Sequence, residues 1–219
     1  MSTMPTFAAA SKALAQSGRR FYDRGWVLGT SGNFSAVVSQ KPLTLAITPS
    51  GAHKGQLTGR EFLRIDGSGR MPSARRPGAP AQDARNTAKP SAETLLHLLL
   101  VRLRGAGAIL HTHSVWSTIL SGRHAGGGGV AIEGYEMLKG LADVTTHAHR
   151  EWIPIVPNDQ DMTRLAGVVE RTLGQHPTAH AFLLERHGLY TWGATIAEAE
   201  RHVEILEFLF ETIGRSKEA

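Results

Sequence analysis

The chain has 219 residues, with 41% hydrophobic and 20% charged residues, a formal net charge of +5 and no cysteine. This composition is typical of a soluble globular protein, and the length predicts a single domain with a sizeable core over residues 1–219. The lack of cysteine excludes disulfides and thiolate metal ligands, which leaves histidine and carboxylate side chains as the strong metal ligands.

The first part of the chain predicts a helix, three strands and a long loop. Apolar residues recur at helical spacing over residues 5–24. The segments 33–38 and 43–48 have strand composition and are predicted to pair as a hairpin, and a third strand is expected at 61–66. Residues 69–89 are rich in Pro, Gly, Ala and Arg without apolar periodicity, which predicts an exposed, mobile basic loop.

The middle of the chain predicts a buried strand between two helices. Ser91 is suited to be the N-cap of a leucine-rich helix over 92–104. Residues 108–113 are largely apolar and predict a buried strand, and Ser114 can cap the short helix that follows. The glycine-rich segment 124–129 predicts a flexible loop.

The last part of the chain alternates helical and strand patterns. We expect a helical turn at 134–141, a strand at 151–156, a helix over 161–173 capped by Asn158 or Asp159, a strand pair at 179–185 and 189–193, and a final helix that begins with a capping box of Thr195 and Glu198. Because several strands are predicted to pair as hairpins, the pattern favours a mixed or mainly antiparallel sheet flanked by helices over a parallel Rossmann sheet.

The apolar and basic segments argue against a membrane or nucleic-acid partner. The longest apolar run, LLHLLLVRL, is interrupted by Arg102 and is shorter than the ~20 residues that span a bilayer. The N-terminus lacks a basic start followed by an apolar run, so we expect a cytoplasmic protein. The basic residues lack the interleaved aromatics or recognition helix of nucleic-acid-binding proteins, and a phosphorylated small molecule remains the expected anionic partner.

Two histidine pairs have the spacing that places both side chains on one face of a strand. His111 and His113 end the buried strand, where they could share one metal ion. His147 and His149 lack an adjoining apolar run and have an arginine beside them, so we assign this pair no metal role. A catalytic zinc usually takes three protein ligands, and His187, just before a glycine, is the best third histidine.

The remaining histidines carry weaker signals. His97 lies among leucines and is predicted to pack in the core, although it competes with His187 as a third ligand. His53 lies in a loop, where it could touch a ligand. We assign no role to the four others, which are His124, His176, His180 and His202.

Two glutamates and two glycine-containing loops complete the candidate site. Glu93 and Glu136 each carry little signal alone, because a carboxylate in the first turn of a helix or on a solvated face is common. The loops GTSGNFS (29–35) and TPSGAHKG (48–55) offer backbone N–H groups and hydroxyls to an anion, and Lys54 adds a positive charge. Neither loop matches a P-loop or a dinucleotide fingerprint, and each on its own is an ordinary turn.

The ordered set of motifs resembles the class II aldolase family. The set comprises GTSGNFS, TPSGAHKG, KPSAE, GAILHTHS, GYEMLKG and HGLYTWG, and the likeness runs from about Phe21 to Phe210. The histidine motifs are shared across that family, whereas EGYEMLKG and HGLYTWG are similar to its methylthioribulose-1-phosphate dehydratase branch, which acts in methionine salvage and methionine biosynthesis.

The resemblance implies a fold, an assembly and a site. It implies a single-domain α/β/α fold around a central, mainly antiparallel sheet, and a homo-oligomer that is commonly a tetramer. It implies one Zn²⁺ per subunit on His111, His113 and His187. The catalytic glutamate of the aldolases falls on Glu93, and the proposed acid/base glutamate of the dehydratases falls on Glu136. The substrate phosphate would contact Gly32, Asn33, Ser50, Gly51, Lys54 and Ser91.

The implied enzyme is a zinc-dependent lyase. It would convert 5-methylthioribulose 1-phosphate to 2,3-diketo-5-methylthiopentyl 1-phosphate through a metal-stabilised enediolate. Glu136 would donate the proton to the leaving hydroxyl, kept protonated by burial near apolar groups. The group that removes the C3 proton stays open between Glu136 and the bound water. Glu93 would be structural, a second acid/base group or a zinc contact.

Two alternatives have the same motifs. A zinc-dependent aldolase acting on fuculose or rhamnulose 1-phosphate would cleave the C3–C4 bond instead of expelling water. A non-catalytic interaction protein on the same fold belongs to a different class, and retention of the three histidines and two glutamates argues against it.

Overall fold

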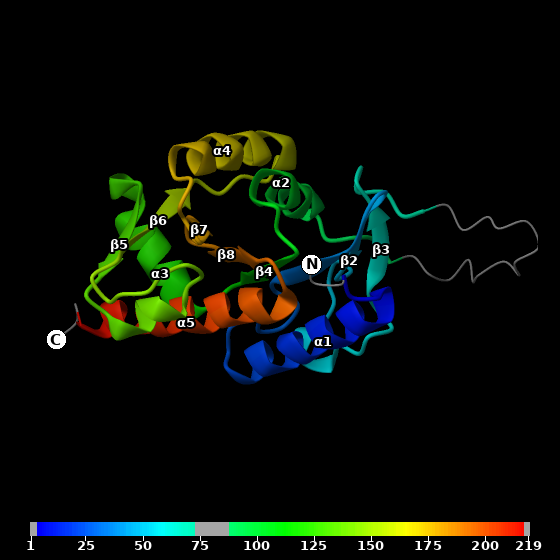
Figure 1. Ribbon diagram of the computed structural model, residues 1–219, viewed down its shortest axis with the longest axis horizontal. Coiled ribbons are helices and arrows are strands. Elements are labelled where there is room, and N and C mark those ends of the chain that lie inside the picture. The colour runs from blue at the N-terminus through cyan, green and yellow to red at the C-terminus, as the bar shows by residue number, and fades with distance from the viewer. Residues whose placement is uncertain (1–3, 73–87, 217–219) are drawn as a thin grey trace, which may run out of the picture.

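An eight-stranded sheet runs through the centre of the molecule in the order β3-β2-β1-β4-β8-β7-β6-β5 (Figure 1). The structure is a computed structural model that describes residues 4–72 and 88–216. Residues 73–87, most of the predicted basic loop, lie outside this part. The strands are β1 (Asn33–Gln40), β2 (Leu43–Ile47), β3 (Leu63–Asp66), β4 (Ala108–Thr112), β5 (Gly129–Glu133), β6 (Arg150–Val156), β7 (Ala181–Leu184) and β8 (Gly188–Gly193).

The strand directions decide which residues meet at each end of the sheet. Every neighbouring pair is antiparallel except β6 and β7, where Val156 lies beside Leu184. The predicted mainly antiparallel sheet is therefore confirmed. Because β4 and β7 are both antiparallel to β8, the carboxyl ends of β4, β6 and β7 lie at one end of the sheet. The first residue of β1 lies there too, since Asn33 is opposite His111.

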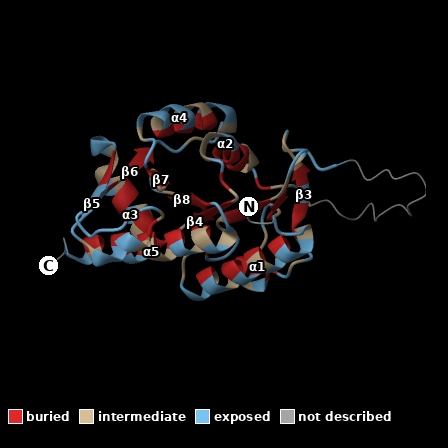
Figure 2. Cartoon of the chain, in the orientation of Figure 1, coloured by how far each residue is buried: buried red, intermediate tan, exposed pale blue. Residues whose placement is uncertain are grey.

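Within the described residues, five α-helices cover the two faces of the sheet. They are α1 (Phe7–Asp23), α2 (Thr94–Arg104), α3 (Val115–His124), α4 (Met162–Gln175) and α5 (Ile196–Ser216). Helices α2 and α4 pack on one face, and α1, α3 and α5 pack on the other (Figure 1). Their buried stripes turn toward the sheet, while their outer sides are exposed (Figure 2). This three-layer arrangement is the predicted α/β/α fold.

Short 3-10 helices fill several connections. They are η1 (Lys54–Gln56), η2 (Ala125–Gly127) and η3 (Glu136–Gly140), the last being the helical turn predicted at 134–141. Across the part of the chain that the structure describes, we find no helix that is both long enough and apolar enough for a bilayer.

The glycine-rich segment departs from the predicted flexible loop. It contains η2 and then the start of β5, the edge strand, which pairs with β6 from Gly129 opposite Pro154. The residue between them, Gly128, has a φ of 74°, a conformation that favours glycine. A Cβ on Gly129 would lie 2.5 Å from the Trp152 ring. The glycines therefore allow a tight turn and a close strand approach.

Two helix caps also differ from the predicted ones. Helix α2 begins at Thr94 rather than directly after Ser91, and a turn between them is closed by Thr94 N–H donating to the Ser91 carbonyl at 3.1 Å. Helix α4 is capped by Asp161, not by Asn158 or Asp159, because its carboxylate accepts from two backbone N–H groups of the first turn. The predicted cap at Ser114 is confirmed.

Candidate functional site

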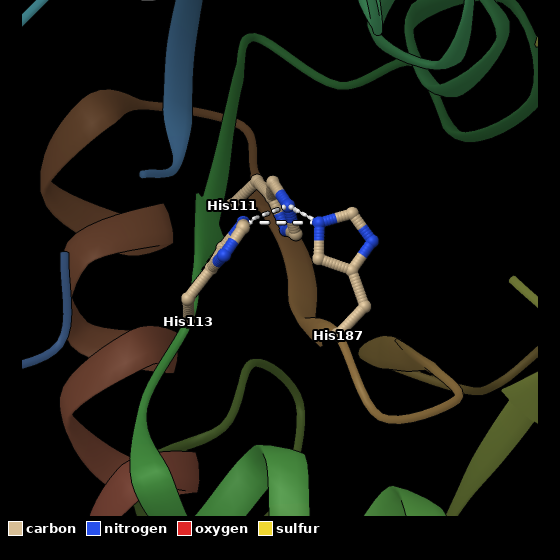
Figure 3. A group of neighbouring side chains, drawn as sticks. All are labelled: His111, His113 and His187. Atoms are coloured by element: carbon tan, nitrogen blue, oxygen red, sulfur yellow. Dashed lines mark hydrogen bonds between the residues drawn. The ribbon is translucent and has the colours of Figure 1, made fainter. Parts of the chain in front are cut away.

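Three histidines converge at the end of the sheet where β4 and β7 finish. His111 belongs to β4, His113 follows that strand by one residue, and His187 lies in the turn from β7 to β8. Their rings face one another (Figure 3). The turn brings His187 close because a Cβ on Gly188 would lie 2.0 Å from the Thr112 carbonyl oxygen, so only glycine fits there.

The three ring nitrogens form a compact triangle. His113 Nε2 lies 2.8 Å from His111 Nε2 and 3.1 Å from His187 Nε2, and the third side measures 3.4 Å. Two nitrogens bound at about 2.05 Å to one tetrahedral zinc lie about 3.3 Å apart. The triangle therefore has nearly the size that a shared zinc ion requires.

Hydrogen bonds on the far side of two rings orient the nitrogens. His111 Nδ1 donates to the Leu189 carbonyl at 2.9 Å, and His187 Nδ1 donates to Asn158 Oδ1 at 3.3 Å. A neutral imidazole with a proton on Nδ1 presents a bare Nε2, so both rings present a lone pair to the centre. Two lone pairs directed at one point, with the Nε2 of His113 beside them, are the arrangement of a metal site.

The electrostatic setting keeps the three rings neutral. Burial lowers the pKa of His111 well below its usual value, and the neighbouring His187 lowers it further. Burial and the adjacent His111 lower the pKa of His113 to about 2, and burial also lowers that of His187. Only the neutral ring can bind a metal, so these shifts favour ligation.

Glu93 lies beside this triangle, at the start of α2. Its Oε2 is 3.5 Å from His111 Nε2 and its Oε1 is 3.8 Å from His187 Nε2. Asn33 Nδ2 donates to Glu93 Oε2 at 2.5 Å, which fixes the carboxylate. Glu93 therefore has the position that a proton-transfer group or a fourth ligand needs.

A buried chain of hydrogen bonds stands behind Glu93. His97 is fully buried, as predicted, and burial lowers its pKa to about 4, so the ring is neutral. Its Nε2 contacts Asn33 Oδ1, and its Nδ1 lies 2.7 Å from the Ser35 hydroxyl. The ring donates to Asn33 and accepts from Ser35, so the order of donation runs Ser35, His97, Asn33, Glu93.

A cavity of about 230 Å³ opens in front of the histidines and brings the two predicted anion loops together. Its wall comprises Thr30, Ser31, Gly32, Asn33, Pro49, Ser50, Gly51, Ser91, Ala92, Glu93, His113, Asn158, Asp159, Gln160, Met162 and His187. Five of the six residues predicted to hold a phosphate are in this wall. Gly32 has a φ of 72°, and a Cβ there would lie 2.6 Å from the His111 carbonyl oxygen.

Lys54, the sixth predicted phosphate residue, does not line the cavity. Its side chain is buried, and its Nζ donates to the carbonyls of Thr30 at 3.0 Å and Ala52 at 2.7 Å. Burial lowers its pKa to about 8. Because Thr30 and Ala52 belong to the two anion loops, Lys54 ties the loops together from behind.

Glu136 lies away from the histidines, and the expected burial is wrong. It starts η3, which follows β5, and the end of β5 pairs with the beginning of β6, the strand whose other end reaches the cavity. Its side chain is 72% exposed and bonds to Lys139 at 2.7 Å. That hydrogen bond lowers the pKa of Glu136, so apolar surroundings do not keep its carboxyl protonated in a single chain.

Two residues near the site were not predicted. Tyr190 stacks on His111 with ring centroids 4.0 Å apart, and burial raises its hydroxyl pKa well above the usual value. Glu207 is a buried carboxyl on α5 that accepts from Thr112 at 2.8 Å. Tyr190 lies in a predicted strand and Glu207 in the predicted final helix, and neither pattern indicated these contacts.

The sequence model of a known protein family matches most of the chain, including the residues of this site. The family described as the class II aldolase and adducin N-terminal domain matches residues 12–213. The chain belongs to the class II aldolase family.

Individual relatives in the class II aldolase family carry a more specific name. A methylthioribulose-1-phosphate dehydratase from Methylococcus capsulatus is 44% identical over 206 residues, which cover 94% of this chain and 93% of the relative. One from Parvibaculum lavamentivorans is 44% identical, with 93% and 92% covered. Each match covers more than nine tenths of both chains.

Solved structures of class II aldolase members share the fold. An L-fuculose 1-phosphate aldolase has a TM-score of 0.75 at 20% identity and covers 100% of this chain and 90% of its own. The L-fuculose-1-phosphate aldolase from Thermus thermophilus has a TM-score of 0.68 at 21% identity, with 94% and 93% covered. Identities this low support the fold alone.

Proposed function

We propose that this chain is a metal-dependent lyase that removes water from 5-methylthioribulose 1-phosphate and yields 2,3-diketo-5-methylthiopentyl 1-phosphate, a step of methionine salvage. The observation that carries the proposal is the cavity in which His113, His187 and Glu93 meet both anion loops. Relatives that share 44% of their residues along nearly the whole chain are named for this reaction. One catalytic domain over residues 1–219 is part of the proposal.

His111, His113 and His187 would hold a zinc ion, one per subunit. When bound, zinc supplies a Lewis-acid charge that stabilises the negative charge developing on substrate oxygens. The anion loops would bind the substrate phosphate through Gly32, Asn33, Ser50, Gly51 and Ser91, whose N–H groups and side chains line the same cavity. Lys54 would contribute by holding the loops, since carbonyl oxygens occupy its ammonium group.

Glu93 is the proton-transfer group that a single chain brings to the reacting atoms. Its carboxylate lies within 4 Å of two of the zinc-binding nitrogens, and Asn33 anchors one oxygen. We propose that Glu93 takes or returns a proton next to the substrate, because hydrogen-bond reach is the first requirement of a general base.

Glu136 would act at the cavity of a neighbouring copy. In its own chain, Glu136 lies near the amino end of β6, whereas the cavity lies at the carboxyl end of that strand. The seven residues of β6, at about 3.3 Å each, separate the two ends by roughly 20 Å. A homo-oligomer, in which an exposed residue of one subunit faces the cavity of the next, would bring Glu136 to the leaving hydroxyl. We therefore propose a homo-oligomer, commonly a tetramer in this family.

The test measures metal content and product together. The wild-type chain should bind zinc and convert 5-methylthioribulose 1-phosphate with loss of water and without carbon fragments. His111→Ala should lose the cavity zinc and at least about 10³-fold of turnover, because the metal supplies several kcal/mol to the barrier. A His176→Ala chain, altered at the end of α4 and outside the triangle and both anion loops, is the matched control and should keep both properties. Full turnover in His111→Ala would refute the proposed site.

The aldolase alternative rests on the shared fold with L-fuculose 1-phosphate aldolase. An aldolase would release a three-carbon phosphate and an aldehyde from fuculose or rhamnulose 1-phosphate. Product analysis on all three substrates separates the two activities. A chain that binds no zinc and turns over none of them would instead support an interaction protein on this fold.

A further inference from the structure

A second histidine and carboxylate group lies at the other end of the strands. It consists of His149, Glu151 and His180, and one ligand atom from each lies within 4.8 Å of the others. Glu151 is in β6, His149 precedes that strand, and His180 precedes β7. Because β6 and β7 are parallel, the group lies at their amino ends, whereas the zinc triangle lies at their carboxyl ends.

The carboxylate of Glu151 is the centre of this group. Its side chain is 2% exposed, and its Oε2 lies 2.7 Å from His149 Nε2 and 3.0 Å from His180 Nδ1. Its other oxygen, Oε1, accepts the backbone N–H of His180 at 3.0 Å. One oxygen is therefore anchored, and the other meets two ring nitrogens at nearly the spacing of ligands on one zinc ion, about 3.3 Å.

A backbone carbonyl decides where the proton of His180 lies. His180 Nε2 is 2.8 Å from the carbonyl oxygen of Ala142, which can only accept, so Nε2 carries the N–H. A neutral ring then turns the lone pair of Nδ1 toward Glu151 Oε2, which also only accepts. Two acceptors 3.0 Å apart need either a proton or a metal ion between them. An N–H bonded to a carbonyl on the far side is the usual support of a metal-binding histidine.

Ala142 is itself held in place. Its N–H donates to His202 Nε2 at 3.0 Å, while His202 Nδ1 donates to the Trp192 carbonyl at 2.7 Å. His202 therefore has no nitrogen left for a ligand, and it orients the segment that orients His180. These two histidines, to which the sequence assigned no role, are built into the interior.

The group opens onto a cavity of about 490 Å³, which leaves room for water or another ligand on an ion. Asp143 and Glu198 add acidic groups to the wall, and Arg104 adds an opposing charge. The guanidinium of Arg104 donates to the carbonyls of Leu173, His176 and Pro177 at 2.7 to 2.9 Å, at the carboxyl end of α4. These hydrogen bonds therefore hold the guanidinium of Arg104 at that end of α4.

We propose that His149, Glu151 and His180 form a second divalent metal site of the zinc class, separate from the triangle of His111, His113 and His187. Two neutral histidines and one carboxylate are a ligand set that zinc takes in proteins, with a further position left for water. The ion would join the segment before β6 to the start of β7. This inference does not depend on the proposed reaction.

A proton is the competing occupant. Burial alone would lower the pKa of His180, but the hydrogen bond and negative charge of Glu151 raise it, so a protonated ring could pair with Glu151 without a metal. The two occupants differ in stoichiometry. A metal site adds a second bound ion per chain, and a proton adds none.

The experiment counts zinc ions. The chain is stripped with a chelator, equilibrated with buffered zinc alone and analysed by elemental emission. We expect two ions per chain for the wild type, one each for His111→Ala and Glu151→Gln, and none for the double variant. Cobalt in the His111→Ala chain should give the visible bands of a four-coordinate site, and these should vanish in the double variant.

Two further variants guard against misfolding and unspecific loss. His149 is partly exposed, so His149→Ala can remove a ligand without opening a buried hole, and it should also bind only one ion. His147→Ala, two residues away and exposed, is the matched control and should bind two. The proposal is overturned if the wild type binds one ion that His111→Ala abolishes, or if Glu151→Gln and His149→Ala both retain two.

Discussion

Glu207 is a buried carboxyl group one layer behind the triangle of His111, His113 and His187. Thr112, the residue between His111 and His113, donates to its Oε1 at 2.8 Å. Among the described residues, Oε2 meets no hydrogen-bond partner. Burial raises the pKa of Glu207 from 4.5 to about 7. The folded state therefore favours the protonated carboxyl of Glu207 over the carboxylate.

The raised pKa predicts a pH-dependent stability. The folded pKa lies above the unfolded one, so the contribution of Glu207 is fully present below about pH 4.5 and is lost as the pH rises through about 7. At about 1.4 kcal/mol per pKa unit, this loss is about 3 kcal/mol. Glu207→Gln lacks the titrating carboxyl and should not show this loss. Between pH 5 and pH 8, the free energy of unfolding of the wild type should therefore fall by about 2–3 kcal/mol relative to that of the variant.

Urea unfolding at the two pH values measures this difference. Glu211→Gln is the matched control, because Glu211 is on the same helix but forms an exposed pair with Arg215. The control should follow the wild type at both values. A Glu207→Gln chain with unchanged pH dependence would show that the buried carboxyl is not the titrating group.

At the scale of elements, the turn from β4 into α3 positions His113, one of the proposed zinc ligands. The side chain of Ser114 caps α3 by accepting the Ser117 N–H at 3.0 Å. His113, the preceding residue, is further held by its own N–H, which donates to the Trp26 carbonyl at 2.7 Å. The start of α3 and His113 are therefore adjacent, so loss of the cap should also disturb the position of the His113 ring.

Removing the cap tests this coupling. Ser114→Ala should cost about 1 kcal/mol of stability, as N-cap losses do. It should also weaken zinc binding at the triangle by roughly tenfold, a size typical of changes around metal ligands. Thr6→Ala removes the cap of α1, where Thr6 accepts the Ala9 N–H at 3.2 Å, and should cost stability alone. Thermal melts and zinc titrations compare the two, and equal zinc affinities would contradict the coupling.

Elements whose own residues carry a clear apolar pattern were predicted. An element whose order comes from pairing with a neighbouring strand was not. Strand β4 and helix α5 carry long apolar patterns and formed where expected. Strand β5 is a short edge strand that starts in a glycine run, and its pairing with β6 supplies the order that its own residues do not. The caps of α2 and α4 were misplaced because several polar residues precede each helix and only packing selects among them.

At the scale of the whole molecule, exposed apolar side chains lie on α3, α5 and η3, and η3 also carries Glu136. Val115 and Ile119 lie one turn apart on α3, Phe208 is on α5, and Met137 follows Glu136 in η3; all four are exposed. Helix α5 packs against both α3 and η3. Exposed apolar side chains on elements that pack together favour an association surface. They support the proposed homo-oligomer.

Complementation tests whether Glu136 serves a neighbouring cavity. His111→Ala and Glu136→Gln should each be inactive alone. Mixed oligomers should recover roughly a quarter of wild-type turnover, because random assortment in a symmetric ring pairs an intact cavity with an intact Glu136 that often. Refolding the two chains together and assaying dehydration measures the recovery.

The matched control mixes two variants of one cavity. His111→Ala and His187→Ala damage the same triangle, so their mixed oligomers should stay inactive. If the Glu136→Gln mixture also stays inactive while its oligomers form normally, Glu136 does not act across subunits. If Glu136→Gln is fully active alone, the residue leaves the mechanism and Glu93 becomes the sole candidate.

The sequence by itself determined the sheet type, the family and the three histidines that meet at one end of the sheet. These rest on local rules, since His111 and His113 share a strand face and Gly188 permits one tight approach, or on motifs that keep their order along the chain. Only the tertiary structure decided that Lys54 points away from the cavity, that Glu136 is exposed and that His149, Glu151 and His180 meet. Those facts depend on which strand ends share an edge of the sheet, and strand order is set by packing among residues far apart in the chain.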